Sequence, residues 1–149
     1  MTIRKATCQE NQEILTYSKK VFEESTMGLL DGIENHETPI GSPFSGDDGY
    51  YLVYSENNVI KGWLGVASTF NYYNGEMVGF ISEVYVIPEY RRKGIARQLC
   101  IEGIKNLKKQ GHHKVQLHVF AGNCAKQLYQ KLGFHEVSRL MEKNIYLDT

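Results

Sequence analysis

Apolar and polar residues alternate along much of the first half of the chain, which is the pattern of half-buried β-strands. Asn74-Gly75 lies between two such runs and favours a tight hairpin, because both central positions of a type I′ turn need positive φ. Pro88 ends the run after that hairpin, since proline has no N–H to donate to a neighbouring strand. The pattern predicts strands at residues 3–6, 50–54, 59–73 and 77–87.

The period of the apolar positions changes from two to about 3.6 after residue 94, which indicates helices. One helix begins near Gly94 and ends at Gly111, and a shorter one ends at Gly133. Near the N-terminus, Thr7-Cys8-Gln9-Glu10 is a capping box, which predicts a helix from there to about Glu24. We also expect a short helix at residues 27–33, a loop at 39–49, a strand at 115–120 and one or two final strands at 134–146.

The order of these elements is β-α-α-β-β-β-α-β-α-β with room for one more strand, which predicts an α/β fold with a mixed sheet. A length of 149 residues suits a single domain over residues 1–149. No apolar run approaches the ~18 residues of a membrane helix, and no signal-peptide stretch follows the first residues. Three scattered cysteines, Cys8, Cys100 and Cys124, favour free thiols in a reducing compartment. We therefore expect a cytoplasmic protein without a membrane partner.

A net charge of zero conceals an uneven distribution. Residues 1–60 carry ten Asp or Glu against four Lys or Arg, whereas residues 86–131 carry ten Lys or Arg against two acids. A basic segment suits a polyanionic partner and an acidic one a cationic partner, although two solvated surfaces would explain the same numbers. Nucleic acid is disfavoured as the partner, because the aromatic residues of the basic segment do not interleave with its cations as a stacking platform would.

The stretch from Val84 to Ala96 carries the candidate chemistry. A strand ends there, a loop follows, and a helix begins at about Gly94, where the first backbone N–H groups have no partners inside the helix. The helix dipole makes that end positive, so phosphates bind there, and Gly94 and Ala96 leave room for a close approach. Arg91, Arg92, Lys93 and Arg97 oppose the dipole of an empty helix end, so a bound anion would offset the cost.

Two motifs together carry a family resemblance. Arg-x-x-Gly-x-Ala at residues 91–96 follows a Val-x-Val strand, and Ala-x-x-Leu-Tyr-x-x-Leu-Gly-Phe follows at residues 125–134. This combination resembles the GNAT superfamily of N-acetyltransferases, and the resemblance is strongest from Phe80 to Phe134. It implies a mostly antiparallel sheet with a splayed central parallel pair, opened by a β-bulge near Glu83.

The resemblance implies acetyl-CoA as cosubstrate and an amine as acceptor. The pantetheine arm would pair with the backbone of Val84 to Val86, and an N–H at Val84 or Tyr85 would polarise the thioester carbonyl. Asn123 matches a pantetheine-binding residue, although its spacing to Ala125 is one residue shorter than usual. The residues that would hold the pyrophosphate and its surroundings are Arg91, Arg92, Lys93, Gly94, Ile95, Ala96 and Arg97.

The resemblance also implies direct attack by the amine, which requires two proton transfers. Tyr129 matches the general acid of the family, which protonates the leaving thiolate. Neither Phe80 nor Ser82, at the positions where relatives often carry the base, can do that work well. Glu83 lies beside them but faces the other way unless a bulge turns it, and His118 is a second candidate. Proton loss through ordered water is a third alternative.

The acceptor side is expected along residues 27–49 and at Tyr72 and Tyr73. The acids there favour a small cationic amine over a peptide amine, although a solvated acidic loop would look the same. The tyrosines of the sheet could instead serve its core or a homodimer contact. A non-catalytic acyl-CoA-binding or sensing module on the same fold is the alternative function, and no residue spacing predicts a metal site. The acids are Asp31, Glu34, Glu37, Asp47 and Asp48.

Overall fold

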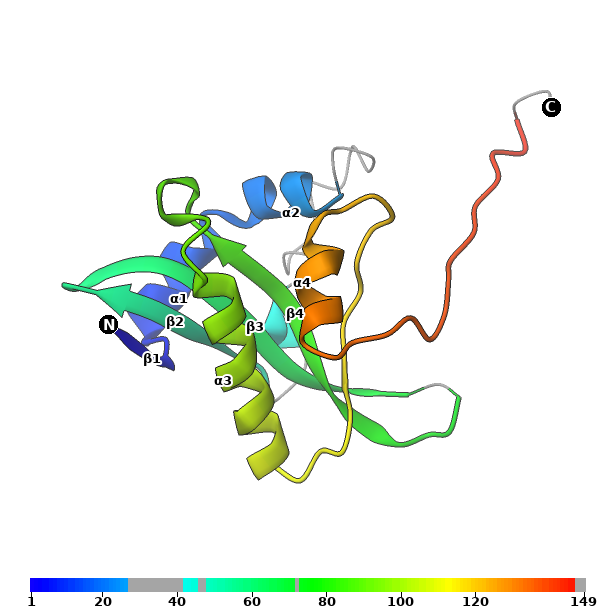
Figure 1. Ribbon diagram of the computed structural model, residues 1–149, viewed down its shortest axis with the longest axis horizontal. Helices are drawn as coiled ribbons and strands as arrows, with labels where there is room; N and C mark the ends of the chain where they lie inside the picture. Colours follow the sequence, from blue (N-terminus) through cyan, green and yellow to red (C-terminus); the bar gives the residue numbers. More distant parts are fainter. Residues whose placement is uncertain (27–41, 46–47, 72, 147–149) are drawn as a thin grey trace.

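The computed structural model describes residues 1–26, 42–45, 48–71 and 73–146, so the expected helix at 27–33 and most of the loop at 39–49 lie outside the described residues. Five strands form one sheet in the order β1-β2-β3-β4-β5 (Figure 1). The first three pairings are antiparallel and the last, between β4 and β5, is parallel. The strands are β1 (Thr2–Lys5), β2 (Tyr50–Glu56), β3 (Val59–Phe70), β4 (Met77–Val86) and β5 (Val115–Gln116).

The predicted N-terminal helix is present as two helices, α1 (Cys8–Leu15) and α2 (Ser18–Thr26). Its capping box is confirmed, because the backbone N–H of Glu10 donates to the Thr7 hydroxyl at 3.2 Å and the Glu10 carboxylate accepts from the Thr7 N–H at 2.9 Å. The break falls at Thr16-Tyr17, where the Thr16 hydroxyl donates to the Glu13 carbonyl at 2.6 Å. Such side-chain bonds to the preceding turn compete with continuation of the helix.

The two later helices match the predicted periodicity. They are α3 (Ile95–Lys109) and α4 (Ala125–Lys131), and short 3-10 turns occupy Pro43–Ser45 and Pro88–Tyr90. No helix in the described part of the chain is both long and apolar enough to cross a membrane.

Helices cover both faces of the sheet and form a core on each. On one face, α3 packs Leu99 and Leu107 against Leu64 of β3, and all three are fully buried. On the other face, Ile14 of α1 and Val21 of α2 pack against a second cluster of aromatic and aliphatic side chains. That cluster comprises Tyr51, Val53, Trp63 and Tyr85.

Two predictions about the C-terminal third are corrected. The strand expected at 115–120 is regular only at Val115–Gln116, because beyond that point β4 no longer runs beside it. The one or two strands expected at 134–146 are wrong: these residues form neither helix nor strand and extend away from the body of the molecule (Figure 1). A strand needs a neighbouring strand for its backbone N–H and C=O groups, and residues 135–146 pair with no strand among the described residues; their large apolar side chains, such as Leu140 and Met141, are exposed.

Candidate active site

A gap opens in the sheet between β4 and the segment after β5. The parallel pairing consists of Gly79 with Val115 and Phe80 with Gln116, and it stops there. On the other side of β4, Gly65 of β3 pairs with Glu83 and Val66 pairs with Ile81, which leaves Ser82 as an extra residue. The bulge expected near Glu83 is therefore present, and the splayed parallel pair is confirmed. A bulge bends its strand and strengthens the local twist, which turns β4 away from its neighbour.

The backbone of β4 beyond the bulge faces this gap. The N–H of Ile87 donates to the Lys61 carbonyl of the β3 side at 2.9 Å. Hydrogen-bonding direction alternates along an antiparallel pair, so Val84 and Val86 point their N–H and C=O groups away from β3 and into the gap. The Val86 carbonyl already accepts from Nε of Arg91 at 2.7 Å, which leaves its N–H and both groups of Val84 for a ligand.

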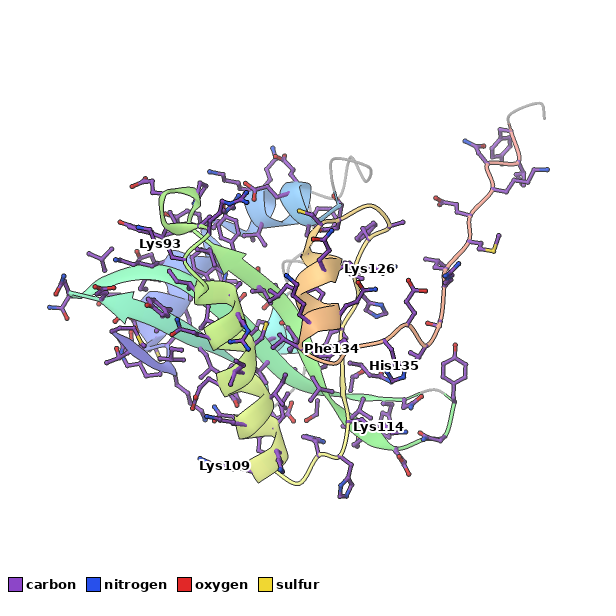
Figure 2. The ribbon with its side chains drawn as sticks, in the orientation of Figure 1. Lys93, Lys109, Lys114, Lys126, Phe134 and His135 are labelled. Carbon is purple, nitrogen blue, oxygen red and sulfur yellow. The ribbon has the colours of Figure 1, made fainter. Side chains whose placement is uncertain are left out.

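The loop that follows β4 has the geometry of an anion cradle. Arg92 and Gly94 both have positive φ, 64° and 77°, on either side of Lys93, and α3 starts at Ile95. When the sign of φ alternates along a loop in this way, successive backbone N–H groups point to the same side. The first turn of α3 begins directly after the loop, and its N–H groups have no partners within the helix. The N–H of Gln98 is the first to bond within the helix, to Gly94 at 3.1 Å. Figure 2 shows Lys93 at this loop, above the start of α3.

Arg91 plays a different part from its neighbours. Its guanidinium forms an ion pair with Glu24 of α2 at 2.7 Å and lies over the ring of Tyr85, 5.1 Å from its centroid. Together with the bond to Val86, these contacts tie α2 to the end of β4. Arg91 is thus bound by protein groups, whereas Arg92, Lys93 and Arg97 are left to provide positive charge at the loop.

Glu83 is turned by the bulge onto the face covered by α1 and α2. A methyl group added to Gly65 would meet both Ser82 Oγ and Glu83 Cγ, so these two residues share that face. The hydroxyl of Tyr51 donates to Glu83 Oε1 at 2.5 Å. Burial raises the pKa of Glu83 to about 7. The Tyr51 hydroxyl lowers this pKa most, and the Trp63 indole has a smaller effect in the same direction. Trp63 Nε1 itself has no partner at hydrogen-bonding distance. A carboxyl group in this state can accept a proton near neutral pH.

Tyr51 is a residue of the candidate site that sequence reasoning did not single out. It pairs with Gly65, which in turn pairs with Glu83, so the three residues lie in one row across β2, β3 and β4. Because Gly65 has no side chain, the Tyr51 ring can reach over it to the carboxylate. Burial, followed by the charge of Glu83, raises the pKa of the Tyr51 phenol, so it stays protonated and donates. The strand register contains this signal, but residue spacing alone does not.

Tyr129 lies on α4 on the opposite face of the sheet, against the core that α3 forms. Its ring meets Phe134 edge to face, with centroids 6.0 Å apart. Burial, with a smaller effect from the Cys100 thiol, raises the pKa of Tyr129 to about 12. The phenol is therefore protonated at neutral pH, as an acid must be before it donates.

His118 and Asn123 have less distinctive surroundings. His118 is exposed and packs edge to face against Phe80, with centroids 5.6 Å apart. The side-chain amide of Asn123 donates to the Ser25 carbonyl at 3.1 Å, and its Oδ1 accepts from the N–H of Ala125 at 2.9 Å. Asn123 thus joins the start of α4 to the end of α2, and a bond to pantetheine would have to replace or share the bond to Ser25.

The expected acceptor side is described only in part, because Asp31, Glu34, Glu37, Asp47 and Tyr72 lie outside the described residues. Asp48 is exposed, and its carboxylate accepts from the N–H of Ser68 at 3.3 Å. Tyr73 lies in the turn before β4, at the opposite end of that strand from the gap, so the structure does not support a role for it there. Among the described residues, no cluster of three or more His, Cys, Asp or Glu is arranged to hold a metal ion.

Comparison with known proteins agrees with this geometry. The model of the acetyltransferase (GNAT) family matches residues 10–134. An aminoglycoside N(6′)-acetyltransferase type 1 of Acinetobacter baumannii is 31% identical over 105 residues, which cover 63% of this chain and 68% of that protein. A mycothiol acetyltransferase of Paenarthrobacter aurescens is 42% identical over 78 residues, which cover 40% of this chain but only 24% of that protein. The match thus spans about a quarter of the mycothiol enzyme.

Solved structures share the fold. One is the crystal structure, with acetyl-CoA, of a predicted acetyltransferase from Clostridium acetobutylicum. It superposes with a TM-score of 0.71 at 20% identity, over 97% of this chain and 96% of that one. The splayed strands, the loop at Gly94 and the family match over residues 10–134 lead to one conclusion: the chain belongs to the acetyltransferase (GNAT) family.

Proposed function

We propose that this protein is an N-acetyltransferase that moves an acetyl group from acetyl-CoA to a primary amine. The observation that carries the proposal is the open edge of β4, where unpaired backbone groups of Val84 and Val86 face the gap directly beside the donor-rich loop at Gly94. A strand-like arm that carries a diphosphate at one end fits such an edge. The structural relative with acetyl-CoA supports that choice of ligand.

The loop would hold the diphosphate. Backbone N–H groups of residues 92–97 point toward one side, and the exposed cations Arg92 and Lys93 add charge around them. The pantetheine arm would add to β4 as an extra strand, using Val84 and the N–H of Val86. This pairing would direct the thioester toward the bulge, where the N–H of Val84 would stabilise the developing negative charge on the carbonyl oxygen. The N–H of Tyr85, the other candidate from the sequence, points toward β3 and is therefore not proposed for this role.

Two side chains on opposite faces of the sheet would move the protons. Glu83, with its pKa near 7, would take the proton that the amine loses as its nitrogen attacks the carbonyl carbon. The carbon–sulfur bond then breaks, and Tyr129 would give its proton to the departing thiolate. The acetyl group thus moves from sulfur to nitrogen without an acyl-enzyme. Glu83 then releases its proton to solvent and Tyr129 regains one from solvent, so both residues return to their starting states. Glu83 also favours an enzyme over the non-catalytic acyl-CoA module, which would have no need of a carboxyl group with this pKa.

The acceptor is proposed to be a small cationic amine. The acid-rich sequence of residues 31–48 supports this choice, and so does the similarity to an aminoglycoside acetyltransferase. A peptide amine is the competing acceptor, and the two can be separated by offering both kinds to the protein.

The test is a screen for thiol release from acetyl-CoA with a panel of polyamines, aminoglycosides and peptides. We expect release with at least one cationic amine, and calorimetry should show acetyl-CoA binding without any acceptor. Tyr129→Phe should lower kcat by about 10²-fold or more with little change in coenzyme affinity, as for loss of a general acid. Tyr54→Phe, on the same core face, is the matched control and should leave kcat unchanged. Binding without turnover on any amine would favour the sensing module, and no binding would refute the proposal.

A further inference from the structure

Trp63, the one tryptophan in the sequence, has a buried N–H group that the fold leaves without a partner. Its side chain is 1% exposed, and Nε1 finds no acceptor at hydrogen-bonding distance within the described residues. A buried donor without an acceptor has lost its bonds to water and gained none in return, so native proteins seldom leave one. This N–H group is therefore available to an acceptor in another state of the protein.

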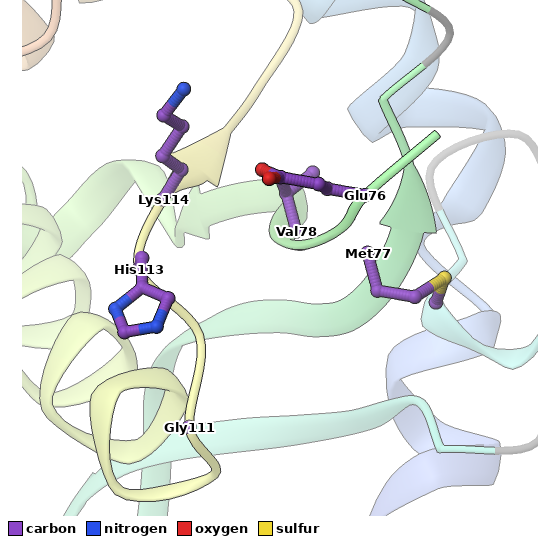
Figure 3. A pocket seen from close by; sticks show the side chains of 6 residues that line it. All are labelled: Glu76, Met77, Val78, Gly111, His113 and Lys114. Carbon is purple, nitrogen blue, oxygen red and sulfur yellow. The ribbon is translucent and has the colours of Figure 1, made fainter. Parts of the chain in front are cut away.

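Aromatic packing fixes the place of the indole. Tyr85 lies opposite Trp63 in the β3–β4 register, with ring centroids 5.0 Å apart, and Tyr17, between α1 and α2, packs against the indole at 5.2 Å. The hollow shown in Figure 3, between His113-Lys114 and the start of β4, lies at the other end of that strand and does not reach the indole. Because Nε1 itself is buried, its acceptor has to be a neighbouring side chain.

Glu83 is the carboxyl group within reach of the indole. Trp63 and Gly65 lie two residues apart on the same face of β3, and Gly65 pairs with Glu83. Trp63 is thus the diagonal neighbour of Glu83, at a backbone separation of roughly 7–8 Å that long side chains can bridge. Gly65 has no side chain to stand between them. Burial raises the pKa of Glu83, whereas the Tyr51 hydroxyl and then the Trp63 indole lower it, and a lowering is the effect of an N–H directed toward the carboxyl group.

The other titratable and charged groups on this face have partners or positions of their own. They come from β2, β4, the α1–α2 turn, α2 and the loop before α3, and they are Tyr51, Tyr85, Tyr17, Glu24 and Arg91. Tyr51 donates to Glu83 Oε1. Glu24 and Arg91 form an ion pair with each other. Burial, followed by the charge of Glu24, raises the pKa of Tyr85, which places its hydroxyl toward α2. The indole N–H is therefore the second donor for Glu83.

We propose that Trp63 is a positioning residue for Glu83: once the carboxyl group has lost its proton, the indole N–H donates to the oxygen that does not accept from Tyr51. A protonated carboxyl group carries its proton on one oxygen, whereas the ionised group accepts strongly at both. The bond thus forms as Glu83 ionises, when its side chain closes on an indole that the packing holds in place. A carboxylate has about four acceptor sites, so two donors leave sites for the proton of an amine.

The bond has two consequences for the base. A second donor favours the ionised, basic state of Glu83 near neutral pH. Two donors on rigid rings also hold the carboxylate in one orientation, which fixes the direction from which an amine can reach it. These consequences rest on the proposed function, in which Glu83 is the base, but the bond itself can be measured without turnover.

The test is nuclear magnetic resonance of the unmodified chain labelled with ¹⁵N. One tryptophan gives one indole N–H signal, which identifies itself. We expect its proton to move downfield as pH rises, with a midpoint near 7, because a bond to a charged acceptor forms when Glu83 ionises. In Glu83→Gln this titration should vanish, which separates it from the titration of the five histidines. An indole signal that does not titrate, or that titrates equally in Glu83→Gln, would overturn the proposal.

Ser82→Ala tests a competing explanation. The Ser82 hydroxyl is also buried without a partner among the described residues, and it lies beside Glu83 at the bulge. A hydroxyl between the indole and the carboxyl group would pass on the change of charge without direct donation. If Trp63 donates directly, the indole titration persists in Ser82→Ala. Loss of the titration in that variant would make Ser82 the partner of Glu83 and would refute the proposal.

A kinetic test separates positioning from packing. Loss of a hydrogen bond to a charged group shifts a pKa by about one to two units, so the acidic limb of kcat/KM should move to higher pH by about that amount in Trp63→Phe. Tyr17→Phe keeps the ring that packs on Trp63 and is the matched control, in which the limb should stay in place. A folded Trp63→Phe variant that is slower at every pH with an unmoved limb would show that the indole only fills space, against the proposal. Where this variant does not fold, or no amine is turned over, the indole titration alone decides.

Discussion

The hydrogen bond from Tyr51 to Glu83 should set the pH at which this protein becomes active. The substitution Tyr51→Phe removes only the hydroxyl oxygen and leaves the ring packed edge to face against Phe44. The hydroxyl stabilises the charged carboxylate, so its loss raises the pKa of Glu83 further above about 7. A hydrogen bond to a charged group contributes about 1.5–3 kcal/mol, and one pKa unit corresponds to ~1.4 kcal/mol. We therefore expect a rise of about one to two units.

The assay is the pH dependence of kcat/KM, which reports the ionisation of the free enzyme. The acceptor should carry its positive charge on a separate group and react through an amine whose own pKa lies well below neutral, so that the acidic limb reflects the protein alone. In the unmodified protein this limb should have its midpoint near pH 7, because Glu83 must be deprotonated to act as base. In Tyr51→Phe the limb should move to higher pH by one to two units, while the rate on the alkaline plateau changes much less.

Two variants control this result. Tyr54→Phe removes a buried phenol from the same strand but on the other face, so the limb should not move. Glu83→Gln should remove the limb together with most of the activity. An unshifted limb in a folded Tyr51→Phe variant would show that Glu83 is not the group that titrates, and the assignment of the base would have to be abandoned.

Three further predictions concern stability and the coenzyme. Because the pKa of Glu83 rises from 4.5 to about 7 on folding, the protein should lose up to about 3 kcal/mol of stability as pH rises from 4.5 through 7. In urea denaturation, Glu83→Gln should therefore be more stable than the native chain at pH 8 but not at pH 4. Gly103→Ala would place a methyl group 2.3 Å from Cδ2 of the fully buried Leu64 and should cost about 1–3 kcal/mol, whereas Lys105→Ala on the exposed side of α3 should be nearly neutral. In Gly94→Ala, the added methyl group would have no described atom within 4 Å, so the backbone strain at a φ of 77° should cost only about 1–2 kcal/mol of stability. Calorimetry should nevertheless show acetyl-CoA binding weakened at least tenfold.

The elements that sequence patterning located correctly are those in which local rules and tertiary packing agree. The capping box at Thr7 and the apolar face of α3 each follow from a few neighbouring residues. A hairpin does connect β3 to β4, but the expected type I′ turn at Asn74-Gly75 is wrong: Gly75 has a φ of 72°, Asn74 does not have a positive φ, and the loop is closed by the Asn71 N–H, which donates to the Glu76 carbonyl at 2.8 Å. The family resemblance added the splayed strands and the loop at Gly94, and both are present. The periodicity of apolar residues did not predict the helix break at Thr16-Tyr17, where the Thr16 side chain bonds to the Glu13 carbonyl.

Predictions that depended on a partner strand were the ones that failed. Residues 117–120 and 134–146 both carry apolar side chains typical of strands, but strand formation needs a neighbour at the right distance, and no periodicity reveals whether one exists. The pairing of Tyr51 with Glu83 was invisible for a related reason. The two residues are 32 positions apart and meet only because Gly65 lies between them in the register.

A single extra residue, Ser82, fixes both halves of the candidate site. Before the bulge, the odd-numbered positions of β4 face α3: a side chain at Gly79 would meet Leu107, and Ile81 lies in that core. After it, the odd-numbered positions face α1 and α2, which is why Glu83 reaches Tyr51.

The same shift acts on the backbone. The N–H of Gly79 donates toward the β5 side, to Lys114, whereas beyond the bulge the odd-numbered Ile87 donates toward the β3 side, to Lys61. The even-numbered Val84 and Val86 therefore point into the gap. If the same sequence continued in regular register, with Ser82 opposite Gly65, Glu83 would lie opposite Leu64 and face α3, and the N–H and C=O groups of Val84 and Val86 would point toward β3. The position of the proposed base and the open edge for the coenzyme therefore arise from the same bulge.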